Sequence, residues 1–199
     1  MLKLLGRKTS GNVQKILFAL EEIGAEYTRE DYGRLFENTR TQAYLSINPT
    51  AKVPTLVDGD LAIWESNTIL RYLAATRAPE LTGETPGEAT QVERWMDFLL
   101  AAVNPGYLAA FKGSKLDPAE RPAAFDAQIA ELHAQMNILN SHLEGQAYVA
   151  LDRLTIADIA LAPIMARCLN FPLERPEMPG LEAWRRRMAE RPAFTAATA

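Results

Sequence analysis

The sequence predicts an α/β N-terminal domain over residues 1–77 and an all-α C-terminal domain over residues 89–199. In the first part, short apolar runs alternate with patterned helices, which is typical of an α/β unit. From residue 89 onward, apolar residues recur at helical spacing and no convincing strand is found. The segment between the two parts, residues 78–88, is polar and carries prolines and glycines, so we interpret it as a linker.

The first domain is expected to begin with a β-α-β unit. Strands are predicted at residues 2–5 and 27–31, and because a helix joins them they should pair in parallel. The apolar positions of that helix recur at helical spacing: Val13, Ile16, Leu17, Leu20 and Ile23. Gly24 follows at the position where helices usually stop.

A helical turn, a β-hairpin and a helix are expected to complete the first domain. The turn is predicted at residues 41–45. Asp58-Gly59 separates the apolar runs PTLV and DLAIW, which is the strongest short-range signal for a hairpin. The helix that follows is expected to place Ile69, Leu70, Tyr72 and Leu73 on one face.

Four helices are expected in the second domain, at residues 89–111, 122–144, 155–168 and 181–190. The third has the clearest start, since Thr155 can cap it and Asp158 stands at the capping-box position. Proline should break or kink the first of these helices at Pro105. Pro163 should kink the third, or the chain tolerates a bend there.

The composition excludes several classes of function. The chain has 21 basic and 25 acidic residues, and this net charge of −4 argues against nucleic acid as a partner. The one cysteine, Cys168, rules out an intramolecular disulfide, and with only two histidines no metal-ligand cluster is expected. No apolar stretch reaches the roughly 18 residues of a membrane helix, and the N-terminus has no signal core, so a cytoplasmic protein is predicted.

Three short motifs are candidates for chemistry. TSGN, residues 9–12, places two hydroxyls and an amide before the first helix, although a serine there often only caps the helix. Val53-Pro54 precedes a predicted edge strand, where a cis proline would leave the Val53 backbone facing outward to pair with an extended peptide. Glu65-Ser66 opens the next helix, whose free N–H groups favour an anion.

A hydrolytic role for Ser10 is not supported. The sequence has no GxSxG elbow, and both histidines fall in the helical half without a clear acidic partner.

In this order and spacing, the three motifs resemble those of the cytosolic glutathione transferase family, especially its serine-type, phi-like and related bacterial members. The resemblance covers nearly the whole chain. It rests on TSGNVQKILFALEEIGAEY, INPTAKVPTLVDGDLAIWESNTILRYLA and LTIADIALAP. It implies a thioredoxin-like N-terminal domain, a helical C-terminal domain that forms the acceptor-substrate site, and a homodimer. One departure is Ala51, where related sequences commonly have glycine.

The resemblance also implies roles for single residues in binding glutathione. Ser10 would donate to the glutathione sulfur and activate the thiol, although Thr9 offers a competing hydroxyl beside it. The remaining contacts fall to a set of residues that would support the loop, hold the glycyl carboxylate, pair with the cysteinyl unit or hold the γ-glutamyl end: Asn12, Arg40, Lys52, Val53, Pro54, Glu65 and Ser66.

The acceptor substrate would lie against the first helix of the second domain, with Tyr107, Leu108 and Phe111 as pocket walls, although plain core packing explains these residues equally well. The leading hypothesis is therefore a glutathione transferase acting on small hydrophobic electrophiles, with glutathione as co-substrate and no metal. Two alternatives stay open. One is another glutathione-dependent reaction, such as peroxide reduction, dehalogenation or isomerisation. The other is a non-catalytic binding or interaction module.

Overall fold

The computed structural model describes all residues from 1 to 199, and these form two compact units. Unit 1 contains Met1–Thr82 and Ala189–Ala199, and unit 2 contains Gly83–Met188. The last eleven residues therefore belong to unit 1, whereas the sequence placed them in the all-α domain.

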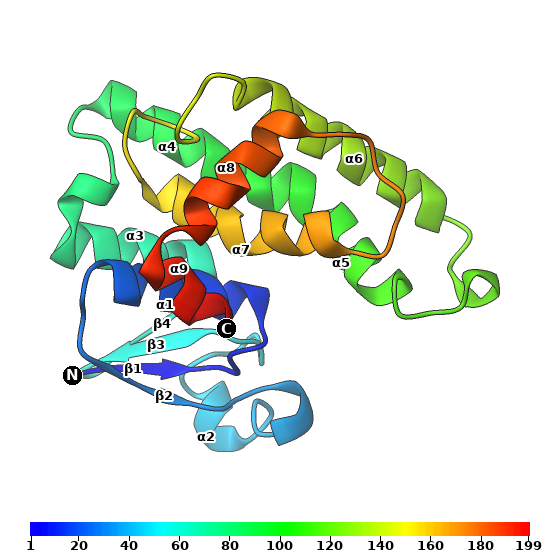
Figure 1. The fold of residues 1–199 in the computed structure, drawn as a ribbon. Helices are drawn as coiled ribbons and strands as arrows, with labels where there is room; N and C mark the ends of the chain where they lie inside the picture. Colours follow the sequence, from blue (N-terminus) through cyan, green and yellow to red (C-terminus); the bar gives the residue numbers. More distant parts are fainter. The chain divides into compact units, whose positions relative to one another are not determined.

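Unit 1 is built on a four-stranded mixed sheet in the order β2-β1-β3-β4 (Figure 1). The strands are β1 (Leu2–Leu5), β2 (Tyr27–Glu30), β3 (Thr55–Asp58) and β4 (Leu61–Trp64). As predicted, β1 and β2 pair in parallel, while β3 runs antiparallel to both β1 and β4. The hairpin loop is Gly59-Asp60 and not Asp58-Gly59, because Asp58 still pairs with Leu61.

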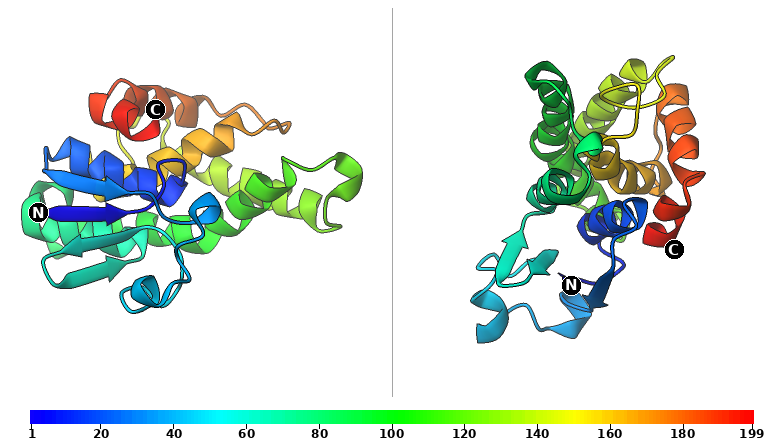
Figure 2. Two further views of the ribbon diagram at one scale, coloured as in Figure 1. Left: turned by 90° about the horizontal axis from the view of Figure 1, so that it is seen from below. Right: turned by 90° about the vertical axis from the view of Figure 1, so that its left-hand side faces the viewer.

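Helices cover both faces of this sheet. The helices α1 (Gly11–Glu22) and α3 (Ser66–Arg77) lie on one face, and α2 (Gln42–Leu45) lies on the other (Figures 1 and 2). The apolar stripe of α1 is buried in the core, and Gly24 follows its end with a positive φ of 63°. Short 3-10 turns, η1 (Arg34–Phe36) and η2 (Pro79–Leu81), flank these elements.

A helix that the sequence did not predict closes unit 1. The segment α9 (Pro192–Thr198) packs on α1, and both views in Figure 2 show the two helices side by side. The rings of Phe18 and Phe194 meet edge to face with centroids 5.3 Å apart. Arg191 forms an ion pair with Glu22 at the end of α1. Thus α9 covers the face of α1 that lies opposite its apolar stripe.

Unit 2 is helical throughout. The helix expected at residues 89–111 is present as α4 (Pro86–Phe98), a π-helical turn η3 (Leu99–Val103) and α5 (Asn104–Gly113). Pro105 has no N–H to donate to the preceding turn. The change of hydrogen-bond register falls just before it, in the wide π turn, and not at Pro105 itself as predicted.

The other helices of unit 2 follow the sequence closely. They are α6 (Phe125–His142), α7 (Ile156–Asn170) and α8 (Pro179–Ala189), and a 3-10 turn η4 (Pro118–Glu120) precedes α6. The capping box is confirmed, with Thr155 and Asp158 bonded reciprocally at the start of α7. Pro163 lies inside α7, which continues past it.

None of the helices combines the length and the apolar composition that a bilayer-spanning helix requires.

Candidate functional site

Strand register brings the three sequence motifs to the same end of the sheet, where β1 and β4 end and β3 begins. Leu5 at the end of β1 pairs with Thr55 at the start of β3, and Thr55 in turn pairs with Trp64 at the end of β4. The TSGN loop, Val53-Pro54 and Glu65-Ser66 each lie within a few residues of these three positions. The spacing in the sequence therefore becomes proximity in the fold.

Two further contacts join the motifs. Gly6 lies against both Val13 of α1 and Val53, since a Cβ added to Gly6 would come within 2.5 Å of Val13 Cγ2 and 3.4 Å of Val53 Cβ. On the other side, Lys15 of α1 donates from Nζ to Ser66 Oγ of α3 at 3.4 Å. A small residue at position 6 and a buried polar contact thus hold the starts of α1 and α3 beside the Val53 segment.

Ser10 stands at the N-cap of α1 without capping it. Its backbone is extended, with φ −86° and ψ 125°, and its carbonyl accepts the first helical bond from Gln14 at 2.9 Å. The side chain makes no cap hydrogen bond. A half-buried hydroxyl at the positive end of a helix is therefore available to a ligand. Thr9 is exposed, and Asn12 is exposed in the first turn of α1.

The strand after Val53 is not the edge strand that the sequence predicted, because β3 lies between β1 and β4, but the main chain of Val53 itself lies before the paired residues of β3. The Val53-Pro54 peptide bond is cis, as the sequence led us to expect. No backbone–backbone hydrogen bond involves Val53, although β3 begins two residues later. An extended ligand could therefore pair with this residue in the manner of an added strand.

Side-chain hydrogen bonds from Asn48 fix the segment before Val53. Asn48 was not among the site residues predicted from the sequence. Its Nδ2 donates to the Lys52 carbonyl at 2.9 Å and to Thr55 Oγ1 at 2.8 Å, and its Oδ1 accepts from the Thr50 backbone and hydroxyl at 3.0 and 2.7 Å. Tyr44 supports the same carbonyl through its hydroxyl at 2.6 Å. The only signal in the sequence was the Asn-Pro pair at 48–49, which marks a turn but not a buried hub.

Backbone strain accompanies two of these segments. Ala51 has a φ of +54° and Glu65 a φ of +69°, both in the left-handed region that favours glycine. Glycine would adopt the Ala51 conformation without the steric strain of a Cβ atom. Glu65 is the N-cap of α3, and its exposed side chain does not cap that helix.

Ser66, by contrast, is buried at the first position of α3, with 4% of its surface exposed. Its partner Lys15 is 1% exposed, and burial lowers the pKa of this amine to about 7 although the Glu65 carboxylate opposes the shift. Lys15 was also missed, because the sequence placed it opposite the apolar stripe of α1.

Two basic residues are predicted to bind the glycyl carboxylate, and neither of their side chains has a partner within the chain. The side chains of Arg40 and Lys52 are both exposed, and neither forms a hydrogen bond or ion pair within the chain. They lie in the segment between β2 and β3, on either side of α2. The structure therefore leaves both charges available to a ligand.

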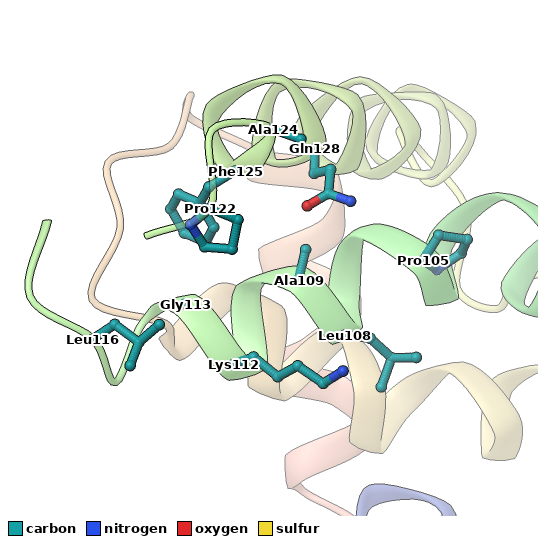
Figure 3. A pocket seen from close by; sticks show the side chains of 10 residues that line it. All are labelled: Pro105, Leu108, Ala109, Lys112, Gly113, Leu116, Pro122, Ala124, Phe125 and Gln128. Atoms are coloured by element: carbon teal, nitrogen blue, oxygen red, sulfur yellow. The ribbon is translucent and has the colours of Figure 1, made fainter. Parts of the chain in front are cut away.

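The three residues predicted to line the acceptor pocket, Tyr107, Leu108 and Phe111, lie on α5. Leu108 lines an open apolar pocket of about 470 Å³ between α5 and the start of α6, together with Leu116, Pro122 and Phe125 (Figure 3). Tyr107 instead packs against Phe111 and Phe171, with ring centroids 6.2 and 6.0 Å apart. Tyr107 is buried and Phe111 is half-buried.

Other reactive groups of the chain do not form a site. Cys168 is buried, and burial raises the pKa of its thiol to about 12, which keeps it protonated and poorly nucleophilic at neutral pH. No group of three or more histidine, cysteine, aspartate or glutamate side chains is arranged to hold a metal ion.

Comparison with known proteins identifies the family. Residues 1–75 match the model of the glutathione S-transferase N-terminal domain, and residues 96–192 match that of the C-terminal domain. Glutathione S-transferase GstB of Escherichia coli is 34% identical over 97% of this chain and 95% of its own length, and glutathione S-transferase 4 of Zea mays is 30% identical over 96% and 89%. The theta class glutathione S-transferase of Xanthomonas axonopodis pv. citri, solved with glutathione bound, superposes with a TM-score of 0.93 at 36% identity, covering 99% of this chain and 96% of that one. The chain belongs to the glutathione S-transferase family.

Proposed function

We propose that this protein is a glutathione transferase that binds glutathione at the end of the sheet where its three motifs meet, lowers the pKa of the glutathione thiol and directs the thiolate at a small hydrophobic electrophile. The observation that carries the proposal is the Ser10 hydroxyl, which occupies the N-cap of α1 but makes no cap bond. A hydroxyl placed only for stability would bond to the first turn of its own helix. At this position it is suited to donate to a sulfur anion.

The strength of such a donor matches what activation requires. A thiol with a pKa of about 8.5 is only about 3% thiolate at pH 7, and the thiolate is the nucleophile. Lowering that pKa by about two units makes it about three-quarters thiolate and corresponds to about 2.7 kcal/mol. A hydrogen bond to a charged group contributes about 1.5–3 kcal/mol, and a helix N-terminus adds about 0.3–1 kcal/mol.

The rest of the tripeptide would lie at the same end of the sheet. The Val53 backbone, free of other main-chain partners, pairs with the cysteinyl unit beside Pro54. Glu65 and Ser66 at the start of α3 hold the ammonium and carboxylate of the γ-glutamyl end, and Asn12 supports the loop of the sulfur. Arg40 and Lys52, whose charges are unpaired within the chain, attract the glycyl carboxylate.

The electrophile would bind against α5, in the region of Tyr107, Leu108 and Phe111, and the active form would be a homodimer. The exposed, apolar surface of Leu108 supports a hydrophobic acceptor. We further propose that the protein belongs to the serine-type, phi-like branch of the family.

Titration of the thiolate absorbance of glutathione in the presence of the protein tests this function. For the wild type we expect a bound-thiol pKa about two units below that of free glutathione, and for Ser10→Ala a return toward the free value. A wild-type titration that coincides with free glutathione, at a protein concentration where calorimetry shows binding, would contradict thiol activation. Absence of binding in calorimetry would leave the interaction module as the better reading.

A further inference from the structure

Lys15 is a buried lysine that forms no ion pair in the structure. It lies in α1 with 1% of its surface exposed, and its ammonium has one hydrogen-bond partner in the structure, Ser66 Oγ at 3.4 Å. A lysine ammonium has three donors to satisfy, and an unpaired buried charge is strongly unfavourable. The single contact therefore links Lys15 to the first residue of α3.

That contact controls which way the Ser66 hydroxyl can act. An ammonium only donates, so when Lys15 is protonated the Ser66 oxygen must accept. The Ser66 hydrogen is then directed elsewhere and can be donated to an anion at the N-terminus of α3, where the helix dipole also favours negative charge. A neutral amine can accept instead, and the Ser66 hydroxyl is then free to donate its hydrogen to Lys15 and to present only lone pairs to a ligand.

The charges around Lys15 do not force it into one protonation state, so a bound ligand can change that state. On the α3 side, Glu65 is the group whose negative charge favours the ammonium, while burial opposes it and brings the pKa to about 7. On the α9 side, Arg191 is paired with Glu22, two turns further along α1. Both protonation states of Lys15 are therefore populated near neutral pH.

We propose that Lys15 is a positioning residue for the γ-glutamyl carboxylate of glutathione: its protonated form fixes Ser66 as a donor to that carboxylate, so binding takes up a proton at Lys15. This inference rests on the proposed function. Lys15 does not touch the ligand and acts through Ser66. The proton comes from solvent, and it is separate from the proton that the thiol releases.

S-methylglutathione isolates the effect, because it keeps the γ-glutamyl end but has no thiol proton to lose. Its affinity is measured by calorimetry between pH 6.0 and 8.5, in two buffers of different ionisation enthalpy. For the wild type we expect uptake of roughly half a proton near pH 7.5 and a Kd that is about five- to tenfold weaker at pH 8.5 than at pH 6.0.

Two variants test whether Lys15 and Ser66 are the source. Lys15→Met keeps the length of the side chain without a titrating group, and we expect no proton uptake from it and a Kd that changes less than twofold over this range. Ser66→Ala keeps the lysine but removes the coupling, and it should also flatten the profile. The losses of affinity in the two variants at pH 6.0 should not add in the double variant, because each breaks the same contact.

The outcomes separate this inference from the function on which it rests. Binding of S-methylglutathione with no proton uptake, or with the same uptake in Lys15→Met, would overturn the role of Lys15 and leave the function intact. Failure of the wild type to bind S-methylglutathione at any pH would overturn both.

Discussion

The side-chain amide of the buried Asn48 donates to the Thr55 hydroxyl at 2.8 Å and ties the start of β3 to the segment before the cis proline. Because Asn48 also bonds to Lys52 and Thr50, it fixes the main chain that leads to Val53. We expect Asn48→Ala to lower the free energy of unfolding by about 1–3 kcal/mol, since it leaves buried polar groups unpaired. It should also weaken glutathione binding, because Asn48 supports the carbonyl of Lys52, the residue before Val53.

Urea unfolding and calorimetry measure these two effects. Asn137→Ala, the same change at an exposed position of α6, is the matched control and should alter neither quantity by more than about 0.5 kcal/mol. Normal glutathione affinity in a destabilised Asn48→Ala would show that the Val53 segment keeps its shape without this support.

The second prediction separates Ser10 from Thr9. Ser10→Ala should lower the turnover number by about 10- to 100-fold, because it removes a charge-assisted hydrogen bond of about 1.5–3 kcal/mol. The affinity for glutathione should change only a few-fold, since the rest of the tripeptide keeps its contacts. Thr9→Ala, at an exposed position, should leave both quantities nearly unchanged. Steady-state kinetics with a chromogenic electrophile measures both, and the reverse pattern would assign the sulfur contact to Thr9.

A third prediction concerns the left-handed backbone at Ala51. An L-residue in this conformation is destabilised by about 1–2 kcal/mol, while glycine loses about 0.5–1 kcal/mol through its freer unfolded chain. Ala51→Gly should therefore stabilise the protein by about 0.5–1 kcal/mol and raise Tm by roughly 1–4 °C. Ala101→Gly, at an exposed position in η3, should instead be destabilising. Calorimetric melting of both variants decides between these signs, and a lower Tm for Ala51→Gly would contradict the strained φ.

The fourth prediction concerns Asp158 in unit 2. Its carboxylate accepts from the Thr155 backbone at 3.0 Å within the capping box, and also from Val149 at 2.9 Å and the Trp184 indole at 3.0 Å. One residue thus joins the start of α7, the preceding loop and α8. Asp158→Ala should lower the free energy of unfolding by about 3–5 kcal/mol, as expected when a buried charged hub is removed.

Denaturant unfolding of the whole protein, followed by far-ultraviolet circular dichroism, measures this effect. Asp152→Ala, at a nearly fully exposed carboxylate, serves as the control and should change stability by less than about 0.5 kcal/mol. Equal effects of the two changes would contradict the role assigned to the buried carboxylate.

The sequence predicted helices and strands well where a local signal determined the structure. The α1 stripe, the capping box at Thr155 and the hairpin each depend on local chemistry, and all three are present. Pro105 shows where local rules fall short. The loss of its N–H could be predicted, but the π turn that accommodates it depends on packing along the whole of α4 and α5.

Lys15 shows the larger gap between sequence and structure. Lys15, Phe18 and Glu22 recur at spacings of 3 and 4 on the side of α1 opposite its apolar stripe, which periodicity assigns to solvent. In the structure α9 packs on Phe18 and pairs with Glu22, and Lys15 is buried beside α3. An aromatic residue outside the stripe was the one hint of a cover. Nothing local could reveal that the cover comes from residues about 170 positions away.

The last prediction follows from the burial of Lys15. Its pKa is about 7 in the folded protein against a reference value of 10.5, so between these pH values the unfolded chain binds a proton that the folded chain does not. Folding is therefore opposed most strongly below pH 7, and wild-type stability should rise with pH through this window by up to about 1.4 kcal/mol per unit. Lys15→Met should stabilise the ligand-free protein by about 3–5 kcal/mol at pH 6, with the advantage shrinking toward pH 10.

Urea unfolding at pH 6, 7, 8 and 9 measures the difference in stability between Lys15→Met and the wild type, in which the titration of all other groups cancels. Lys8→Met, at an exposed position, should give a small and pH-independent difference. A constant advantage of Lys15→Met across the series would mean that Lys15 keeps an ordinary pKa in the fold, whereas a shrinking one would show that burial lowers this pKa.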